Sequence, residues 1–282
     1  LFTAVSEGLL LGKFVAYVDP QALDPRALNV PHLGDALTRA SRMQNLTLSA
    51  NAATAIGCGV QGLHAAQLID AEHHQQEVIE LVWKLTRNEL LSPISPDSNP
   101  MLFALHDSAR ETAADFSRRR PEQLLLRWIN HHVHTFIKQH PSQTLLRTTF
   151  AVSNLHVDLA DGLVLAVLLH QVLPPSSRPA LPAKQLPPQE LAQKVVEWST
   201  AAKVVFEVTE EDIVLPRKRL LLAYVAALFD NYPCLPVDIS ARSATKSKRF
   251  NSQSREERAL RMWMASLGLG LQLTNLYEDC AS

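Results

Sequence analysis

The chain repeats itself, and this repetition limits what it can fold into more than any other feature. Residues 154–161 read NLHVDLAD and residues 275–282 read NLYEDCAS, so Asn, Leu, Asp and Ala recur at the same offsets. The opening residues LFTAVSEG fit the same pattern when Gly8 is aligned with Gly162. A sequence that returns to one phase is typical of successive copies of a single folding unit.

A second recurring element lies ahead of two of these motifs. The run Leu-Leu-Arg-Trp ends at Trp128, and the similar run Leu-Arg-Met-Trp ends at Trp263. No counterpart precedes Leu1. We therefore expect the chain to be an excised fragment whose first copy lacks its opening helix.

These marks predict three copies of unequal completeness. We place an incomplete first copy at 1–92, a complete second copy at 122–236 and the start of a third at 254–282. Between them, 93–121 opens with prolines and turns basic, and 237–253 is rich in Ser, Lys and Arg. Such compositions favour linkers.

Hydrophobic periodicity predicts an all-α protein without a convincing strand ladder. Segments 123–138 and 190–204 are apolar along one face, as expected of half-buried helices. Segment 218–230 is apolar on nearly all sides, which indicates a buried central helix, and 77–91 is similar but less extreme. Three rings fall among periodic apolar neighbours, which predicts that they pack in the cores: Trp83, Trp128 and Tyr224.

Two polar features also have a structural interpretation. Asp161 and Gly162 precede an apolar helical pattern, so we expect the carboxylate to cap that helix. Segment 173–188 holds six prolines, which predicts a surface loop with extended backbone.

Composition excludes several classes of protein. The 27 Lys and Arg nearly balance the 28 Asp and Glu, so there is no basic footprint for nucleic acid. Cys58, Cys234 and Cys280 lie far apart without a Cys-x-x-Cys pair, which favours neither a disulfide framework nor a zinc site and fits a reducing compartment. No apolar run approaches the ~20 residues of a membrane span.

The order of these motifs resembles the calponin-homology domain. The second copy carries Trp128 on its first helix, an Asp-Leu-Ala-Asp-Gly-Leu turn at 158–163, Glu-Asp-Ile at 211–213 and a buried closing helix. The resemblance implies tandem calponin-homology domains, each a compact bundle of four main helices.

Within this class the chain is similar to the fimbrin/plastin family. Residues 46–60, LTLSANAATAIGCGV, and the later Val-Trp-Lys-Leu at 82–85 resemble the first repeat of that family. Residues 254–269, SREERALRMWMASLGL, resemble the opening of its third repeat. The first copy departs from the family pattern with Glu7 and Ala4 at positions that usually hold Asp.

The resemblance implies a function. Fimbrins carry two actin-binding pairs of repeats, so this chain is expected to bind filamentous actin and, in the full-length protein, to crosslink filaments into bundles in the cytoplasm. We expect a monomer that is not an enzyme and that needs no cofactor. Calcium would act only through EF-hands outside this chain, because no DxDxDG loop is present.

The family meets actin with helices at the junction of the two repeats, which correspond here to 77–91 and 123–138. Basic and polar side chains on these helices would face the acidic filament, although each could also be an ordinary solvated group. They are Lys84, Arg87, Arg127, His131 and Lys138.

Two other functions remain open from the sequence. A divergent calponin-homology scaffold could bind other cytoskeletal or signalling partners. A metal-dependent enzyme could use His131, His132 and His134, but no Glu lies between them as in HExxH, and no acidic partners surround them.

Overall fold

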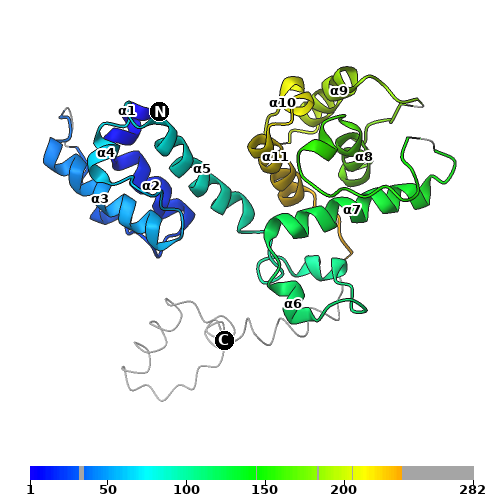
Figure 1. Ribbon diagram of the computed structural model, residues 1–282, viewed down its shortest axis with the longest axis horizontal. Helices are drawn as coiled ribbons and strands as arrows, with labels where there is room; N and C mark the ends of the chain where they lie inside the picture. Colours follow the sequence, from blue (N-terminus) through cyan, green and yellow to red (C-terminus); the bar gives the residue numbers. More distant parts are fainter. Residues whose placement is uncertain (32–34, 144, 183, 205, 237–282) are drawn as a thin grey trace, which may run out of the picture. The chain divides into compact units, whose positions relative to one another are not determined.

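The described part of the chain is entirely helical. Every regular element within it is an α- or 3₁₀-helix, as Figure 1 shows for this computed structural model, which confirms the all-α prediction. The expected linker at 237–253 and third copy at 254–282 lie outside the described residues. The structure describes residues 1–31, 35–143, 145–182, 184–204 and 206–236.

The helices follow the order that the repeat predicts. The first copy contains α1 (Phe2–Ser6), α2 (Leu9–Val18), η1 (Pro25–Ala27), α3 (Arg39–Ala55), α4 (Ala65–Ile69) and α5 (Gln75–Leu91). The segment after it contains η2 (Pro100–Leu105) and α6 (Ala113–Ser117). The second copy contains α7 (Pro121–Gln139), η3 (Val157–Leu159), α8 (Leu163–Val172), α9 (Pro188–Ala201), α10 (Glu210–Val214) and α11 (Lys218–Asn231).

The first copy packs around α2, α3 and α5. Its core includes Leu11, Leu46 and Leu85, each at most 1% exposed. The buried Asn45 of α3 holds the preceding loop, because its amide oxygen accepts from the Asn29 backbone N–H at 2.8 Å and its amide nitrogen donates to the Asn29 carbonyl at 2.9 Å. A buried amide whose donor and acceptor are both satisfied fixes its neighbours at little desolvation cost.

The second copy packs around α11. All residues from Leu221 to Phe229 are buried, which confirms the prediction of a central helix. The Trp128 indole donates a 2.7 Å hydrogen bond to the Pro233 carbonyl, so the first helix of this copy is tied to its last residues. The Tyr224 hydroxyl lies 2.6 Å from the Ser199 hydroxyl, and burial raises the pKa of Tyr224 to about 12. Trp128 and Tyr224 are thus core residues, as predicted.

The entry into α8 confirms the capping interpretation. The Asp161 carboxylate accepts from the Leu163 backbone N–H at 2.9 Å, which satisfies one of the free amides of the first turn. Gly162 has φ of +73°, and a Cβ there would lie 3.3 Å from the backbone nitrogen of Ala192 on α9. A side chain at this position would therefore be strained twice, by its backbone and by close packing.

Two stretches differ from the sequence expectation. The helix expected at 190–204 ends at Ala201, because the chain turns through Lys203 with φ of +56°. The stretch expected as a linker at 93–121 holds η2 and α6, with Leu102 and Phe116 buried and the Phe103 and Phe116 rings 5.6 Å apart. After its proline-rich start, this stretch contains enough apolar side chains to form a small folded segment.

The proline-rich stretch forms a loop, as the sequence predicts. Residues 173–182 and 184–187 form a loop without regular structure, and Pro188 begins α9. Residues 1–95 and 119–234 form one compact unit, and residues 96–118 belong to another. In the described residues, no helix has the length and apolar character needed to cross a membrane.

Candidate binding surface on α5 and α7

Helix α5 has one buried face and one open face. Val78, Leu81 and Leu85 point into the first core, whereas Ile79 is 45% exposed. Trp83 is half-buried, so the prediction that it is a core residue is wrong. A ring on the boundary face of an amphipathic helix continues the apolar pattern of the sequence, but only the packing of another element decides how much of it is covered.

Lys84 points back into its own copy. Its ammonium group donates a 2.7 Å hydrogen bond to the Gly59 carbonyl, in the loop after α3. The Lys84 carbonyl in turn lies 3.5 Å from the Cys58 thiol, whose pKa is raised by burial. Lys84 therefore holds α5 against this loop instead of presenting its charge freely to solvent.

Ion pairs join α5 to the second copy within the same compact unit. Arg87 pairs with Glu122 in the first turn of α7. Arg219 of α11 pairs with Glu80, and its guanidinium carbon lies 5.5 Å from the centre of the Trp83 ring. Cation–π contacts of this kind are worth roughly 0.5–1 kcal/mol at exposed sites.

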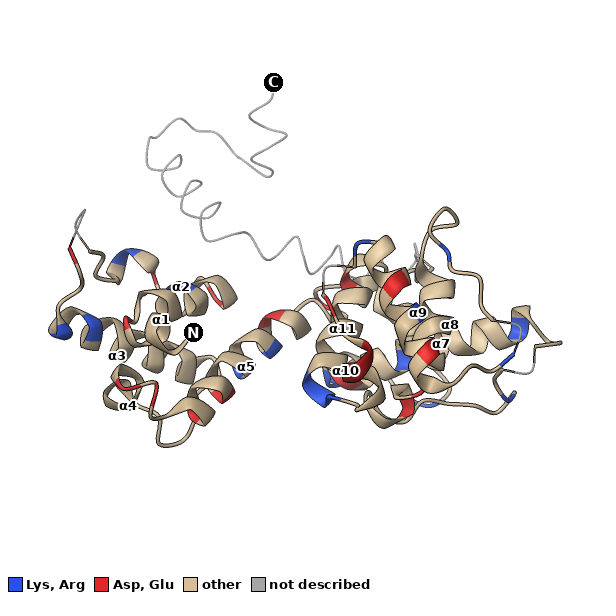
Figure 2. Ribbon diagram, turned by 90° about the horizontal axis from the view of Figure 1, so that it is seen from above, with Lys and Arg blue, Asp and Glu red and all other residues tan. Residues whose placement is uncertain are grey.

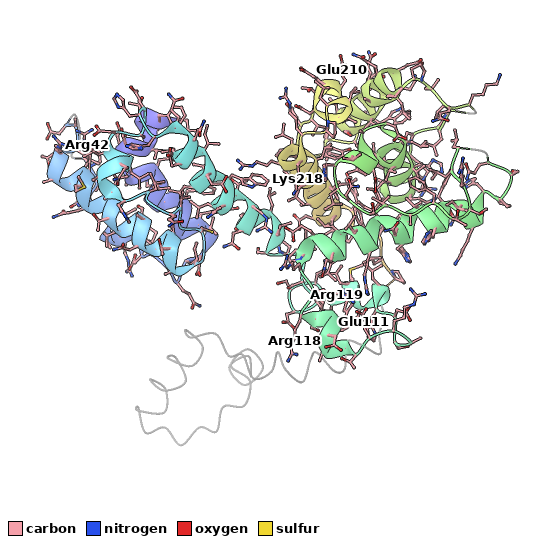
Figure 3. All side chains as sticks on the ribbon, viewed as in Figure 1. Arg42, Glu111, Arg118, Arg119, Glu210 and Lys218 are labelled. Atoms are coloured by element: carbon pink, nitrogen blue, oxygen red, sulfur yellow. The ribbon has the colours of Figure 1, made fainter. Side chains whose placement is uncertain are left out.

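Trp83, Arg87, Glu122 and Arg219 belong to the lining of a pocket of about 670 Å³. Four of its lining side chains are basic and one, that of Glu122, is acidic, so the pocket is electropositive. Lys218, labelled in Figure 3, is the first residue of α11 and one of the four basic residues. The lining residues are Trp83, Arg87, Arg120, Glu122, Gln123, Leu126, Asn154, Leu155, His156, Lys218, Arg219 and Leu222.

Three of the predicted residues lie along one stripe of α7. Arg127, His131 and Lys138 are four and eleven residues apart, which places them within about 40° around the helix axis. Arg127 and His131 are half-buried, and Lys138 is exposed. Burial lowers the pKa of His131, and the charges of Lys138 and His134 lower it further. At neutral pH this stripe therefore combines charged ends with a neutral ring.

The other two histidines of α7 point to backbone carbonyls. His132 is 4% exposed, and its ring nitrogen lies 3.4 Å from the Pro233 carbonyl; burial lowers its pKa to about 4. The His134 ring nitrogen lies 3.2 Å from the Phe150 carbonyl. No cluster of three His, Cys, Asp or Glu that could hold a metal occurs among the described residues.

Comparison with known proteins shows which proteins this chain is similar to. The model of the calponin homology (CH) domain matches residues 119–234. The chain is 30% identical over 280 residues to fimbrin of Saccharomyces cerevisiae, covering 99% of this chain and 41% of that protein. It is 31% identical over 288 residues to plastin-1 of Homo sapiens, covering 100% of this chain and 43% of that protein. The chain belongs to the fimbrin and plastin family.

A solved structure agrees with this fimbrin/plastin assignment at the level of the fold. The crystal structure of the actin-crosslinking core of Schizosaccharomyces pombe fimbrin superposes with a TM-score of 0.60 at 24% identity, covering 97% of this chain and 49% of that one. The chain thus spans about two fifths of the length of the relatives named above.

The structure of this fimbrin/plastin-family chain brings together only some of the residues predicted as a site. Arg87 meets α7 through Glu122, and Arg127, His131 and Lys138 share one stripe, whereas Lys84 serves its own copy. Sequence reasoning missed Glu80, Glu122 and Arg219. The only sign of such a contact was a basic pair at 218–219 before an apolar helix. The sequence does not indicate which acidic residues this pair would meet.

Proposed function

We propose that this chain binds filamentous actin through the open face of α5 and the basic stripe of α7. Membership of the fimbrin and plastin family supports the proposal. The observation that carries it is the pairing of Arg87 with Glu122, because this contact brings the outer face of α5 next to the first turn of α7. Two helices held in this way can offer one continuous surface to a filament.

Charge and apolar area on this surface have separate roles. Arg87 and Lys138 would steer the chain toward an acidic filament and make binding sensitive to salt. Exposed Ile79 and half-buried Trp83 would supply apolar contact, which carries much of the affinity in protein interfaces. Lys84 contributes indirectly, by holding α5 in place through Gly59.

We also propose how the full-length protein acts in the cell. In the full-length protein this pair of domains would supply one filament-binding site, and a second site elsewhere would allow crosslinking. We propose a cytoplasmic, actin-associated monomer that acts as a binding module without catalysis or a cofactor of its own. A divergent scaffold for other partners is less favoured, since the similarity to fimbrins and plastins extends over the whole chain.

Co-sedimentation with actin filaments tests the proposal. The chain should appear in the pellet at high centrifugal force, where single filaments sediment. At low force, where only bundles sediment, it should leave the filaments in the supernatant. Absence from the high-force pellet, for a sample whose circular dichroism is helical, would contradict filament binding. Pelleting at low force would show that one pair of domains, or self-association, suffices to bundle.

A further inference from the structure

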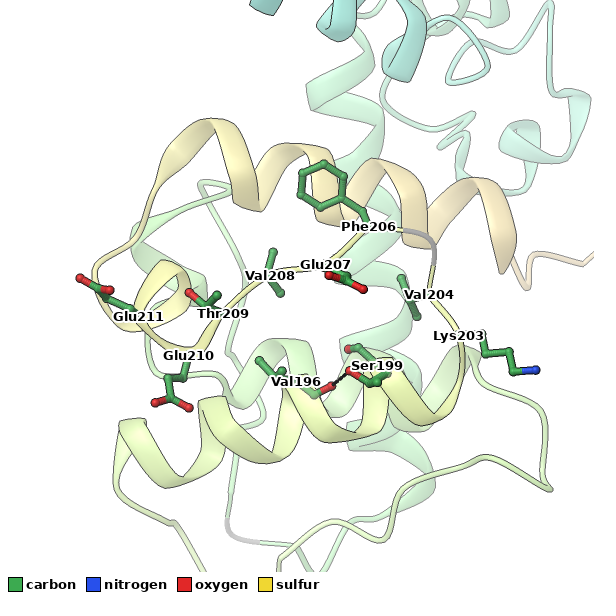
Figure 4. A pocket seen from close by; sticks show the side chains of 11 residues that line it. Val196, Ser199, Lys203, Val204, Phe206, Glu207, Val208, Thr209, Glu210 and Glu211 are labelled. Carbon is green, nitrogen blue, oxygen red and sulfur yellow. Dashed lines mark hydrogen bonds between the residues drawn. The ribbon is translucent and has the colours of Figure 1, made fainter. Parts of the chain in front are cut away.

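A second groove lies within the second copy, away from the residues that line the α5–α7 surface. It has a volume of about 1020 Å³ and runs between α9 and the segment that leads into α10, as Figure 4 shows. None of its lining residues belongs to α5 or α7. The lining residues are Val196, Ser199, Thr200, Lys203, Val204, Phe206, Glu207, Val208, Thr209, Glu210 and Glu211.

The floor of the groove is apolar. Val204 and Val208 are buried, and Val196 and Phe206 are half-buried, so the latter two expose part of their apolar surface to whatever enters. In Figure 4, Val196 on α9 lies across the opening from Val204 and Val208 of the facing segment, and the Phe206 ring lies on the side of that segment toward α11. Exposed apolar surface gathered in a concave site favours an occupant that brings a bulky apolar group.

The rim of the groove is acidic. It carries Glu207, Glu210 and Glu211 against a single Lys203, and all four residues are exposed. Glu211 lies 3.6 Å from Arg217, whereas Glu207 and Glu210 pair with no basic side chain in the described residues. In Figure 2 the ribbon of α10 is coloured largely as acidic residues. The net charge of the rim favours a cationic occupant.

The walls of the groove are fixed by hydrogen bonds. On one side the Thr209 hydroxyl donates to the Asp212 carboxylate at 2.8 Å, and the Asp212 backbone N–H donates back to that hydroxyl at 3.2 Å. On the other side Ser199 is held by Tyr224 at 2.6 Å. A groove that exists before its ligand arrives binds without a large ordering cost.

We propose that this groove binds a Lys- or Arg-rich peptide segment of a partner protein that carries one bulky apolar residue. The apolar residue would enter between Val196 and Val208, and the flanking cations would meet Glu207 and Glu210. Lys203, two residues after the end of α9, would repel a cation at that end of the groove and so set the direction of the peptide. The groove gives this fimbrin/plastin-family chain an interaction surface separate from the one proposed for actin.

Fluorescence anisotropy on the full chain tests this proposal. The probe is a labelled nine-residue peptide with four lysines or arginines around one central phenylalanine. We expect saturable binding with Kd of about 10–100 μM, typical of a small, partly electrostatic interface, and weakening as salt rises. A matched peptide with serine in place of phenylalanine should bind at least about tenfold more weakly, since its apolar anchor is lost.

Charge-reversal variants test whether the peptide binds in this groove. The double variant Glu207→Lys/Glu210→Lys should lose at least tenfold in affinity. The control Glu190→Lys/Asp230→Lys changes the net charge equally at exposed positions outside the groove and should bind as the parent does. Circular dichroism verifies that both variants keep their helices. Equal binding by the groove variant, equal loss in the control, or indifference to the phenylalanine would each overturn the proposal.

Discussion

The ammonium group of Lys84 donates a hydrogen bond of 2.7 Å to the carbonyl oxygen of Gly59, 25 residues earlier in the chain. The contact holds α5 against the loop after α3. A lysine that the sequence presents as a possible partner contact is therefore also a structural tie. Substitution of Lys84 should therefore lower the stability of the first copy more than it weakens binding.

Replacing Lys84 with methionine should lower the free energy of unfolding of the first copy by about 1–2 kcal/mol. Methionine keeps an apolar stem but leaves the half-buried Gly59 carbonyl without its charged donor, and hydrogen bonds to charged groups are worth about that much. Urea unfolding followed by circular dichroism measures the change. The control Lys138→Met removes an exposed ammonium and should be nearly neutral; an equal loss in both variants would contradict a specific role for Lys84.

His132 should make the second copy less stable in acid. Its pKa is about 4 in the folded protein because of burial, against roughly 6.5 when unfolded. The unfolded state therefore binds more protons between these values, so the stabilisation is complete above pH 6.5 and is lost as the pH falls toward 4. At pH 5 the loss should be about 2 kcal/mol relative to pH 7.5.

Urea unfolding at the two pH values, with His132→Asn alongside, checks this prediction. The variant cannot titrate at this position, so its stability should fall less between pH 7.5 and pH 5. The difference between the two proteins isolates His132 from the other histidines. Identical pH dependence in both would show that the ring is solvated or already protonated in the fold.

Arg219 should control how tightly the second copy covers α5. Reversing its charge, Arg219→Glu, places two carboxylates together at Glu80 and removes the cation over Trp83. Because both groups are partly exposed, the combined effect is small, and we expect a shift of roughly two- to tenfold toward a loosened junction. Hydrogen exchange of the α5 amides should become faster. Filament binding should fall by a similar factor, because α5 and α7 are then held less firmly as one continuous surface.

The charge-swapped variant Glu80→Arg/Arg219→Glu provides the control. It restores an ion pair between the same two positions and should return both exchange and filament binding toward the parent values. Failure of the swap to rescue either measurement would mean that Arg219 acts through something other than this pair.

Lys138 tests the proposed actin surface directly. Lys138→Glu should weaken filament co-sedimentation several-fold at low salt and less at high salt, because an exposed charge on an interface mainly changes electrostatic attraction. Lys184→Glu, an exposed position in the proline-rich loop, should bind as the parent does. Unchanged binding by Lys138→Glu at low salt would remove the α7 stripe from the filament contact.

Much of the fold could be predicted from the order of apolar residues. The helices expected at 77–91, 123–138 and 218–230 occur as α5, α7 and α11, because helical periodicity is a local property that neighbouring residues encode. The cap by Asp161 is local as well, since a carboxylate two residues before an amide needs no tertiary partner to reach it. The resemblance to the fimbrin/plastin family also came from the sequence, through motifs that recur in a fixed order.

The sequence by itself determined the helices and most of their buried faces. Only the tertiary structure decided what the long polar side chains touch. Lys84 meets Gly59, Arg87 meets Glu122 across 35 positions, and Arg219 meets Glu80 across 139. The physical reason is that burial of apolar residues follows the period of one helix, whereas the partner of a flexible charged side chain depends on which distant segment packing brings within its reach.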